Sequence, residues 1–143
     1  MGDAANDFAT QIAGIEADGG RGVMHVGDLS TARDLSDVRD TVRAMQTVVD
    51  RGTPGEATNV GRGSPVRIRE VLEMLLAQSQ TKVEVRTAKE RLRPADEPTL
   101  YPDVTRLRAL GFTPTYSLKN TLHDLLTFWR SHPELIPKKA EAR

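Results

Sequence analysis

Two arginines offer the clearest binding chemistry in this sequence. Arg33 follows a short apolar run, and Arg93 lies in a proline-bearing stretch that reads Arg93-Pro94-Ala95-Asp96. A guanidinium group presents parallel N–H donors that match two phosphate oxygens at once, which an ammonium group cannot do. Composition alone favours surface ion pairs, which contribute about 0–1 kcal/mol each. Residue chemistry therefore leaves two alternatives for these arginines, an anion site or surface ion pairs.

The three histidines form no recognisable catalytic or metal-binding set. His25 lies in or beside an expected strand, whereas His123 and His132 lie on the last expected helix and at its end. No pair has the spacing of a metal-binding helix motif. A hydrolase built on His123 and Asp124 would lack a nucleophile and an oxyanion donor. We interpret all three histidines as structural or solvated.

A glycine-bearing segment, Gly61-Arg62-Gly63, raises the question of a phosphate loop. No Lys-Ser/Thr pair follows it, and Val66 stands where the last glycine of a G-x-G-x-x-G pattern would be. The segment is better interpreted as a turn between a strand and a helix.

Composition restricts the class of protein. With 143 residues, 38% apolar and 28% charged, the chain has the make-up of one globular domain with a sizeable core. The 20 basic and 20 acidic residues cancel, so no long-range field would gather nucleic acid or an anionic membrane. The absence of cysteine excludes disulfides and thiolate sites, and no run approaches the ~20 apolar residues that span a bilayer. We expect a cytoplasmic protein.

The elements that must position the arginines alternate between helix and strand. Apolar periodicity and capping residues predict the following helices: residues 5–18, a helix capped by Ser36 that ends at Arg51 and Gly52, residues 68–76, a short helix from Asp103 to Gly111, and a last helix capped by Ser117. Short strands are expected at residues 23–26, 57–60 and 83–85, and a loop at 91–102. The pattern predicts an α/β fold with a small, partly parallel sheet flanked by helices. Three short strands are few for a self-sufficient α/β domain, so the chain is expected to be part of a larger fold.

Six segments in this order resemble the C-terminal half of extended short-chain dehydrogenases/reductases, in the NAD-dependent epimerase/dehydratase family. The likeness is closest to GDP-mannose 4,6-dehydratases and GDP-4-keto-6-deoxymannose reductases, and it covers nearly the whole chain. The matching text is Asp7-Phe8-Ala9-Thr10-Gln11-Ile12-Ala13, Val26-Gly27-Asp28-Leu29, Arg33-Asp34-Leu35-Ser36-Asp37-Val38-Arg39-Asp40, Thr58-Asn59-Val60-Gly61, Arg93-Pro94-Ala95-Asp96, and Leu110-Gly111-Phe112-Thr113-Pro114 with Trp129-Arg130 after it.

The resemblance implies a binding site for a nucleotide-diphosphate sugar. Arg33 and Arg93 match arginines that grip the diphosphate, and Asp96 matches an acidic residue that accepts hydrogen bonds from the ribose hydroxyls. Phe8 and Gln11, on the first helix, would line the pocket for the base and diphosphate.

Three further roles are expected to be structural. Asn59 is expected to fix the local backbone, and Asp37 and Asp40 to cap and charge the start of the second helix.

The same resemblance places the catalytic and cofactor motifs outside this sequence. The family's glycine-rich turn for NADP, its Tyr-x-x-x-Lys pair and its Ser/Thr partner belong to an N-terminal segment that this chain does not contain. Tyr101 and Tyr116 are no substitutes, because Thr105 and Asn120 stand where the lysine is needed. We therefore expect no catalytic residue, metal or cofactor in this chain, with NADP or NAD in the full-length family enzyme.

The sequence thus predicts a sugar-nucleotide-binding domain over residues 1–132 and a polar tail over 133–143. Its ligand would be GDP-mannose or GDP-4-keto-6-deoxymannose, bound as the substrate half of a dehydratase- or reductase-like enzyme that is inactive alone. Partners would be the missing N-terminal Rossmann half or a second copy, with no nucleic acid and no membrane. The alternative is a non-catalytic interaction or dimerisation module derived from that fold.

Overall fold

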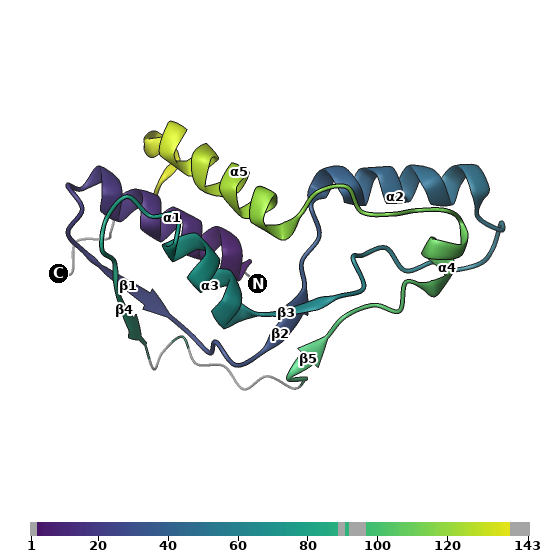
Figure 1. The fold of residues 1–143 in the computed structure, drawn as a ribbon, viewed down its shortest axis with the longest axis horizontal. Coiled ribbons are helices and arrows are strands. Elements are labelled where there is room, and N and C mark those ends of the chain that lie inside the picture. The colour runs from purple at the N-terminus through teal and green to yellow at the C-terminus, as the bar shows by residue number, and fades with distance from the viewer. Residues whose placement is uncertain (1–2, 89–90, 92–96, 138–143) are drawn as a thin grey trace. The chain divides into compact units, whose positions relative to one another are not determined.

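The computed structural model describes residues 3–88, 91 and 97–137, and these form two compact units that draw on separate stretches of the chain (Figure 1). The described residues of Met1–Asp28, Val71–Arg93 and Leu122–Arg143 make unit 1, and those of Leu29–Glu70 and Pro94–Thr121 make unit 2. The elements in chain order are α1 (Ala4–Ala17), β1 (Val23–Val26), β2 (Ala32–Asp34), α2 (Val38–Arg51), β3 (Pro65–Arg67), α3 (Ile68–Leu76), β4 (Glu84–Thr87), β5 (Thr99–Leu100), α4 (Thr105–Ala109), α5 (Leu118–Ser131) and the 3-10 helix η2 (Pro133–Leu135).

Unit 1 contains a two-stranded parallel sheet. β1 pairs with β4 in a register that runs from Val23 opposite Glu84 to Val26 opposite Thr87. Parallel strands need a long crossover connection, so the partner of β1 lies far along the chain. The core of the unit comes from the apolar faces of its helices and of β1, with these buried side chains: Phe8, Ile12, Met24, Val26, Val71, Leu72, Leu75, Leu122 and Leu126.

An ion pair joins α1 to α5 in unit 1. The Arg130 guanidinium donates from Nε and Nη2 to the two Glu16 carboxylate oxygens, each at 2.8 Å, and from Nη2 to the Gln78 carbonyl at 2.8 Å. Hydrogen bonds from Arg130 outweigh the opposing effect of burial and hold the pKa of Glu16 below its ordinary value of 4.5. Two-point pairing of this kind fixes direction as well as distance, so it sets the register between the helices.

Unit 2 contains a three-stranded sheet in the order β3-β2-β5. β2 runs antiparallel to β3 and parallel to β5. A small separate core lies beside the sheet, formed by Ala44, Val104, Leu107 and Phe112, with Val48 and Val60 packed against it. The fold class predicted from the sequence is confirmed, since the chain is a mixed α/β structure with small, partly parallel sheets flanked by helices.

Several predicted element boundaries are confirmed by the geometry of the helix ends. The Ser117 hydroxyl accepts a hydrogen bond from the Asn120 amide at 3.2 Å, as expected of the cap of α5. Asp103 is not the cap of α4: Val104 takes that place, although the Asp103 carboxylate accepts a hydrogen bond from the Thr105 amide at 2.9 Å. Gly111 has φ of +86°, the left-handed conformation expected after α4. Local hydrogen bonding determines these ends, which is why local sequence predicts them.

Other predictions about the elements are wrong. Residues 57–60 have no regular secondary structure and pair with no described strand, because a strand-like sequence becomes a strand only beside a partner. The predicted strand 83–85 lies at Glu84–Thr87, and the predicted loop 91–102 contains β5. Ser36 is not the cap of α2. Asp37 takes that place, since its carboxylate also pairs with the Arg39 side chain.

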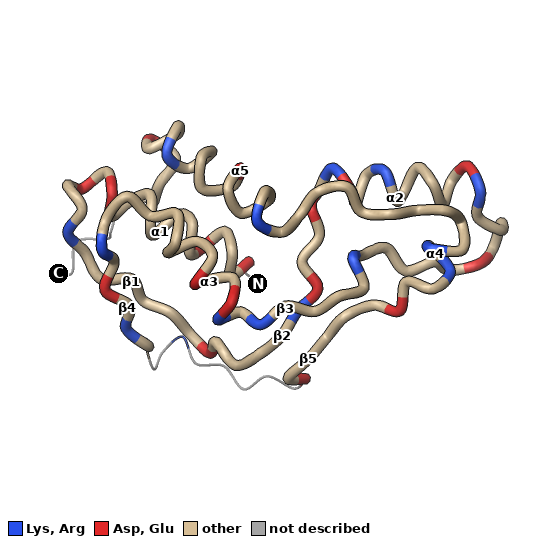
Figure 2. The backbone as a smooth tube through the Cα atoms, viewed as in Figure 1, with Lys and Arg blue, Asp and Glu red and all other residues tan. Residues whose placement is uncertain are grey.

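No helix in the described part of the chain is long and apolar enough to cross a membrane. Across the same residues, no cluster of three or more metal-ligating side chains is present. Figure 2 shows basic and acidic residues interspersed along the tube, in keeping with the balanced charge of the sequence.

Candidate functional site

Among the predicted site residues, Arg33 has a defined place in a sheet and defined hydrogen-bond partners. It lies in the middle of β2, opposite Val66 of β3 and Leu100 of β5. Its Nη1 donates to the Ala32 carbonyl at 2.7 Å and approaches the Pro98 carbonyl at 3.4 Å. Within the described residues, these neutral carbonyl oxygens orient the guanidinium without forming an ion pair with it.

A shallow hollow of about 520 Å³ lies beside Arg33 within unit 2. It is lined by Arg33, Asp34, Ser36, Thr41, Val60, Gly61, Leu100, Tyr101 and Pro102. The side chains of Leu100 and Tyr101 are large, apolar and more than half exposed, at 59% and 53%. A cation beside an exposed aromatic ring suits a ligand that combines negative charge with a flat or ring-shaped group.

Asp34, the neighbour of Arg33 on β2, holds the glycine-bearing loop that shapes one side of the hollow. Its Oδ2 accepts hydrogen bonds from the amides of Arg62 at 2.8 Å and Gly63 at 3.2 Å. Gly63 has φ of +71°, which turns successive amides toward one point. The loop therefore cradles an internal carboxylate. The predicted turn between a strand and a helix is wrong in its flanks, because residues 57–60 form no strand with any described residue and the loop leads into β3.

Gly61 brings this loop close to its neighbours. A Cβ atom at position 61 would collide with Asp34 Oδ2, and it would lie 2.6 Å from the Pro102 ring. Only glycine allows this approach, so the loop and the segment after β5 pack tightly at the edge of the hollow.

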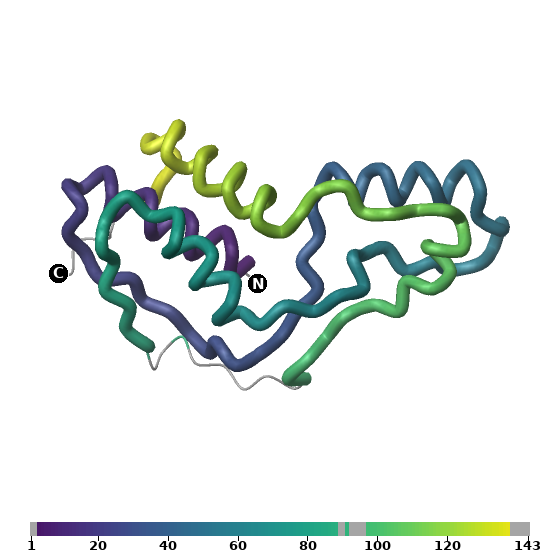
Figure 3. The backbone as a smooth tube through the Cα atoms, in the orientation of Figure 1, coloured from purple at the N-terminus to yellow at the C-terminus, as the bar shows by residue number. Residues whose placement is uncertain are grey.

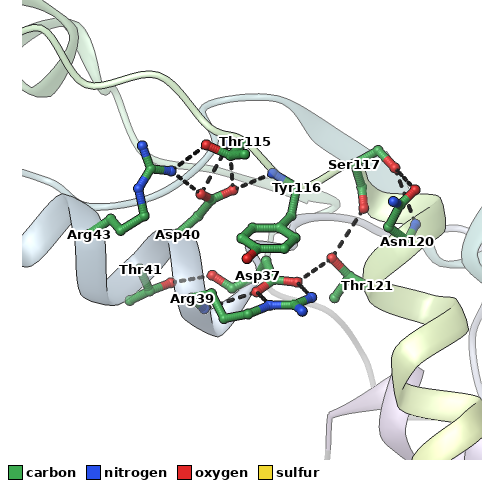
Figure 4. A network of polar contacts seen from close by, with 10 residues as sticks. All are labelled: Asp37, Arg39, Asp40, Thr41, Arg43, Thr115, Tyr116, Ser117, Asn120 and Thr121. Carbon is green, nitrogen blue, oxygen red and sulfur yellow. Dashed lines mark hydrogen bonds and ion pairs between the residues drawn. The ribbon is translucent and has the colours of Figure 1, made fainter.

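Two buried carboxylates fix the helix that follows β2 (Figure 4). Asp40 accepts hydrogen bonds from the backbone amides of Thr115 and Tyr116, each at 2.9 Å, and from Arg43 Nη1 at 2.6 Å. Burial acts to raise the pKa of Asp40, but these donors outweigh it and the pKa is lowered. The carboxylate therefore stays charged and ties α2 to the 115–116 backbone.

Asp37 forms the second half of this arrangement. Its carboxylate accepts two bonds from the Arg39 side chain, at 2.8 and 2.7 Å, and one from the Thr121 hydroxyl at 2.7 Å. The Arg39 guanidinium also lies 3.7 Å from the centroid of the Tyr116 ring. The side-chain hydrogen bonds of Arg39 lower the pKa of Asp37 strongly. Asp37 and Asp40 thus have the structural roles that the sequence predicts, and they position the segment after Arg33.

Gln11 and Phe8 belong to unit 1 and have internal partners. The Gln11 amide acts like the edge of a strand, because its Oε1 accepts from the His25 amide at 2.9 Å and its Nε2 donates to the His25 carbonyl at 3.0 Å. Phe8 is only 3% exposed. Near Gln11, Asp7 pairs with Arg91 at 2.7 Å along a hollow of unit 1 of about 790 Å³.

The five predicted ligand residues are therefore spread over different parts of the chain. Arg33 lies in unit 2, Phe8 and Gln11 lie in unit 1, and Arg93 and Asp96 lie outside the described residues. Their ligand contacts stay predictions.

Sequence reasoning missed Leu100 and Tyr101 as lining residues, since it weighed Tyr101 only as a proton donor. The sequence feature that could have identified them is an aliphatic residue followed by an aromatic one within the loop 91–102, which was expected to contact ligand. Asn59 does fix local backbone, donating to the Asp103 carbonyl at 3.0 Å.

Comparisons with known proteins give the family context. The family model for GDP-mannose 4,6 dehydratase matches residues 5–125. The chain is 29% identical, over 132 residues, to the GDP-6-deoxy-D-mannose reductase of Pseudomonas aeruginosa, and the match covers 92% of this chain and 42% of that protein. The chain therefore spans less than half the length of this relative.

Solved structures of related enzymes match the fold of this chain. RMD from Pseudomonas aeruginosa, complexed with NADPH, matches with a TM-score of 0.82 and 29% identity over 91% of this chain and 43% of that chain. UDP-glucose 4-epimerase from Brucella ovis, in complex with NAD, matches with a TM-score of 0.70 and 23% identity over 91% of this chain and 42% of that chain, a likeness of fold alone.

Proposed function

Because this chain belongs to the GDP-mannose 4,6-dehydratase family, we propose that it binds a nucleotide-diphosphate sugar. The ligand is GDP-mannose or GDP-4-keto-6-deoxymannose, held as the substrate part of a dehydratase- or reductase-like enzyme. The single observation that carries this proposal is Arg33, a charged guanidinium oriented by carbonyls at the rim of a hollow that also presents Tyr101. The proposed binding domain comprises residues 1–132.

Each residue has a defined part in the proposal. Arg33 and Arg93 contact the diphosphate, where two-point hydrogen bonds to phosphate oxygens are strongest. Asp96 accepts hydrogen bonds from the ribose hydroxyls. Phe8 and Gln11 contribute through α1, although a direct contact by Gln11 would compete with its bonds to His25.

The chemistry of the family enzyme would need a dinucleotide, which relatives bind as NADPH or NAD. A dinucleotide site uses a glycine-rich turn whose amides face the pyrophosphate. The glycine-bearing loop at Gly61–Gly63 does not fit this role, because its amides already face the Asp34 carboxylate. We therefore assign this chain the substrate-binding part alone, inactive without the cofactor-binding part of the family fold.

Calorimetric titration tests the proposal. GDP and GDP-mannose should bind with heat and UDP more weakly, and Arg33→Ala should weaken GDP binding by about 10- to 100-fold, the loss expected for charge-assisted hydrogen bonds. Arg33→Lys should recover only part of the affinity, because an ammonium cannot make the two-point contact. Arg67→Ala is the matched control, since it removes the same charge from the neighbouring strand β3.

The absence of heat with every GDP ligand would end the proposal, as would equal losses in the Arg33 and Arg67 variants. A second candidate function, a non-catalytic interaction module, is favoured by one observation: apolar side chains that are exposed along α2. Absence of heat together with a dimer in sedimentation would support that alternative.

A further inference from the structure

The described chain folds back on α1 after α5. Pro133 has no backbone N–H and its ring would clash with the carbonyl four residues earlier, so α5 ends at Ser131 and the chain turns into η2. The residue after η2, Ile136, is extended, with φ of −69° and ψ of 124°. η2 lies against α1, and both belong to unit 1. We call residues 133–137 the strap.

Two neighbouring residues of the strap differ in what they contact. Ile136 is partly buried, and a Cβ atom placed on Gly14 of α1 would lie 3.4 Å from its Cγ2 atom. Ile136 therefore rests on the helix at a position where α1 has no side chain. Leu135, by contrast, is 54% exposed. One aliphatic side chain of the strap thus packs on α1, and its neighbour is open to solvent.

The strap forms one wall of the hollow of about 790 Å³ in unit 1. Pro133, Ile136 and Pro137 line the hollow from the strap, and residues that include Gln11 of α1 and Val23 of β1 line the rest. All three lining residues of the strap have apolar side chains, so the strap supplies an apolar wall to a hollow that elsewhere carries polar groups.

The strap is held firmly at its start and loosely along its length. The Arg130–Glu16 ion pair fixes the end of α5 to α1 just before the strap begins. Further along, the amides of Leu135 and Ile136 donate to carbonyls three residues earlier, at 3.0 and 3.2 Å. Among the described residues, no hydrogen bond or ion pair joins the strap to α1 or β1. Because apolar contact alone holds it against α1, the strap can open at low free-energy cost.

The lining of the hollow matches a nucleobase. Two turns along α1 from Gly14, Asp7 pairs with Arg91 at 2.7 Å, and both residues line the hollow. A carboxylate accepts N–H bonds and a guanidinium donates them, which is what the polar edge of a planar base requires. The apolar strap offers a surface to the face of the base. Gln11, to which the proposed function gives a part in nucleotide binding, lines the same hollow. A hexose, with hydroxyl groups around its ring, would leave the apolar wall without a matching surface.

We propose that the strap is a movable wall that closes over the base of the bound nucleotide and sets the rate at which the nucleotide dissociates. With the base in the hollow, the strap gains apolar surface to pack on and opens less often. The inference rests on the proposed function and deepens it by assigning control of ligand release to a named segment. The strap lies outside residues 5–125, which the family model matches, so the match itself does not supply this role.

Hydrogen–deuterium exchange on the whole chain tests closure. The amides of residues 134–136 report on the strap, because its two prolines carry none. GDP and guanosine, which both contain the base, should slow exchange there about tenfold at saturating concentration. Inorganic pyrophosphate, which lacks the base, should leave it unchanged. Exchange in β4, elsewhere in unit 1, is the reference for a general stabilisation of the unit.

A matched pair of variants tests control of release. Ile136→Ala removes the side chain that packs on α1, and Leu135→Ala removes an isomeric side chain that is open to solvent. Ile136→Ala should raise the dissociation rate of GDP about 3- to 10-fold and change the association rate less than about twofold, because the lost contact belongs to the closed complex. Leu135→Ala should change neither rate, and Ile136→Val should stay close to the native chain. Displacement of a ribose-labelled fluorescent GDP by unlabelled GDP measures the dissociation rate.

The strap and the proposed function fail in different ways. GDP binding that depends on Arg33, with unchanged exchange at 134–136 or equal dissociation rates in the Ile136 and Leu135 variants, would overturn the strap and leave the proposed function standing. Exchange slowed only as much as in β4, or slowed equally by pyrophosphate, would also overturn the strap. Protection of the strap by guanosine, with GDP binding that Arg33→Ala leaves intact, would overturn the diphosphate contact and leave the strap standing. No binding of either GDP or guanosine would end both.

Discussion

Adjacent residues of β2 divide two tasks between them. The Arg33 guanidinium lies at the hollow, where its proposed task is to contact a ligand, and Asp34 binds the amides of the loop that forms the hollow's side. Both side chains line the same hollow, and Asp34 holds the loop beside it. Arg33 thus supplies the positive charge at the hollow, and its neighbour Asp34 determines the shape of the loop beside it.

Replacing Asp34 tests this division of tasks. Asp34→Asn keeps the size of the side chain but offers one acceptor oxygen in place of two, and it brings N–H groups toward the loop amides. We expect the free energy of unfolding to fall by about 1–3 kcal/mol, measured by urea denaturation. Asp50→Asn is the control, since Asp50 is exposed and accepts a hydrogen bond from the exposed side chain of Gln46. If the Asp34 variant were as stable as the Asp50 variant, the hydrogen bonds from the Arg62 and Gly63 amides to Asp34 would not stabilise the fold.

Single residues were predictable from the sequence only where a local or family pattern marks them. Arg33 stands in a motif that the family resemblance supplies, and the cap at Ser117 follows from local chemistry. The pairing of Gln11 with His25 could not be predicted, because it joins residues that are 14 positions apart through side-chain geometry. The exposure of Tyr101 likewise depends on where β5 lies, which no local pattern states.

Helix α2 begins with two buried, charged side chains. Its N-cap, Asp37, and its first turn, through Asp40, each contribute a buried carboxylate, and both stay charged because guanidinium groups and backbone amides surround them. Buried charges of this kind stabilise a fold only while all partners are present. The helix is therefore held firmly and is sensitive to the loss of either carboxylate.

Acid should weaken this attachment in a predictable direction. The folded pKa of Asp40 is lowered, so the unfolded chain binds a proton more tightly than the folded one. Its contribution is fully present above the ordinary value of 3.8 and is lost as the pH falls through the lower folded value. Urea midpoints measured from about pH 6 to about pH 3 should decline in the native chain. Asp40→Asn should be less stable at neutral pH and should show a shallower decline, and an unchanged slope would contradict this account.

The sheets show where prediction from sequence fails at the scale of elements. The long helices were predictable because an apolar stripe repeats over several turns. β2 and β3 have three residues each, too few for a period, and β2 carries two charged residues. Residues 57–60 have a strand-like sequence and no strand partner among the described residues, so local propensity and structure disagree there.

At the scale of the whole molecule, the chain passes between the two units more than once. Unit 1 takes its described residues from three stretches and unit 2 from two, as the colour ramp in Figure 3 shows. A composition that suits one globular domain gave no sign of this division, because it depends on which distant stretches meet. The family resemblance supplied the order of the segments and the α/β class, but not the boundaries of the units.

This division leads to an expectation about local stability. Each unit has its own core and a carboxylate held by hydrogen bonds, the partly buried Glu16 in unit 1 and the buried Asp40 in unit 2. Glu16→Gln would leave the Arg130 guanidinium, whose side chain is 22% exposed, without its charged partner. We expect it to lower the opening free energy of amides in α1, β1 and β4 by about 1–3 kcal/mol, with a smaller effect in β2 and α2. Asp40→Asn should show the opposite distribution.

Native-state hydrogen–deuterium exchange with peptide resolution measures both distributions in one experiment. Because cooperative units open as wholes, a variant that weakens one unit should speed exchange throughout that unit. Glu134→Gln is a matched control, since it makes the same chemical change at an exposed carboxylate in η2 and should alter neither unit. Equal losses of protection in both units from either variant would contradict this expectation. The chain would then unfold as a single cooperative body, and the two compact units would not open independently of each other.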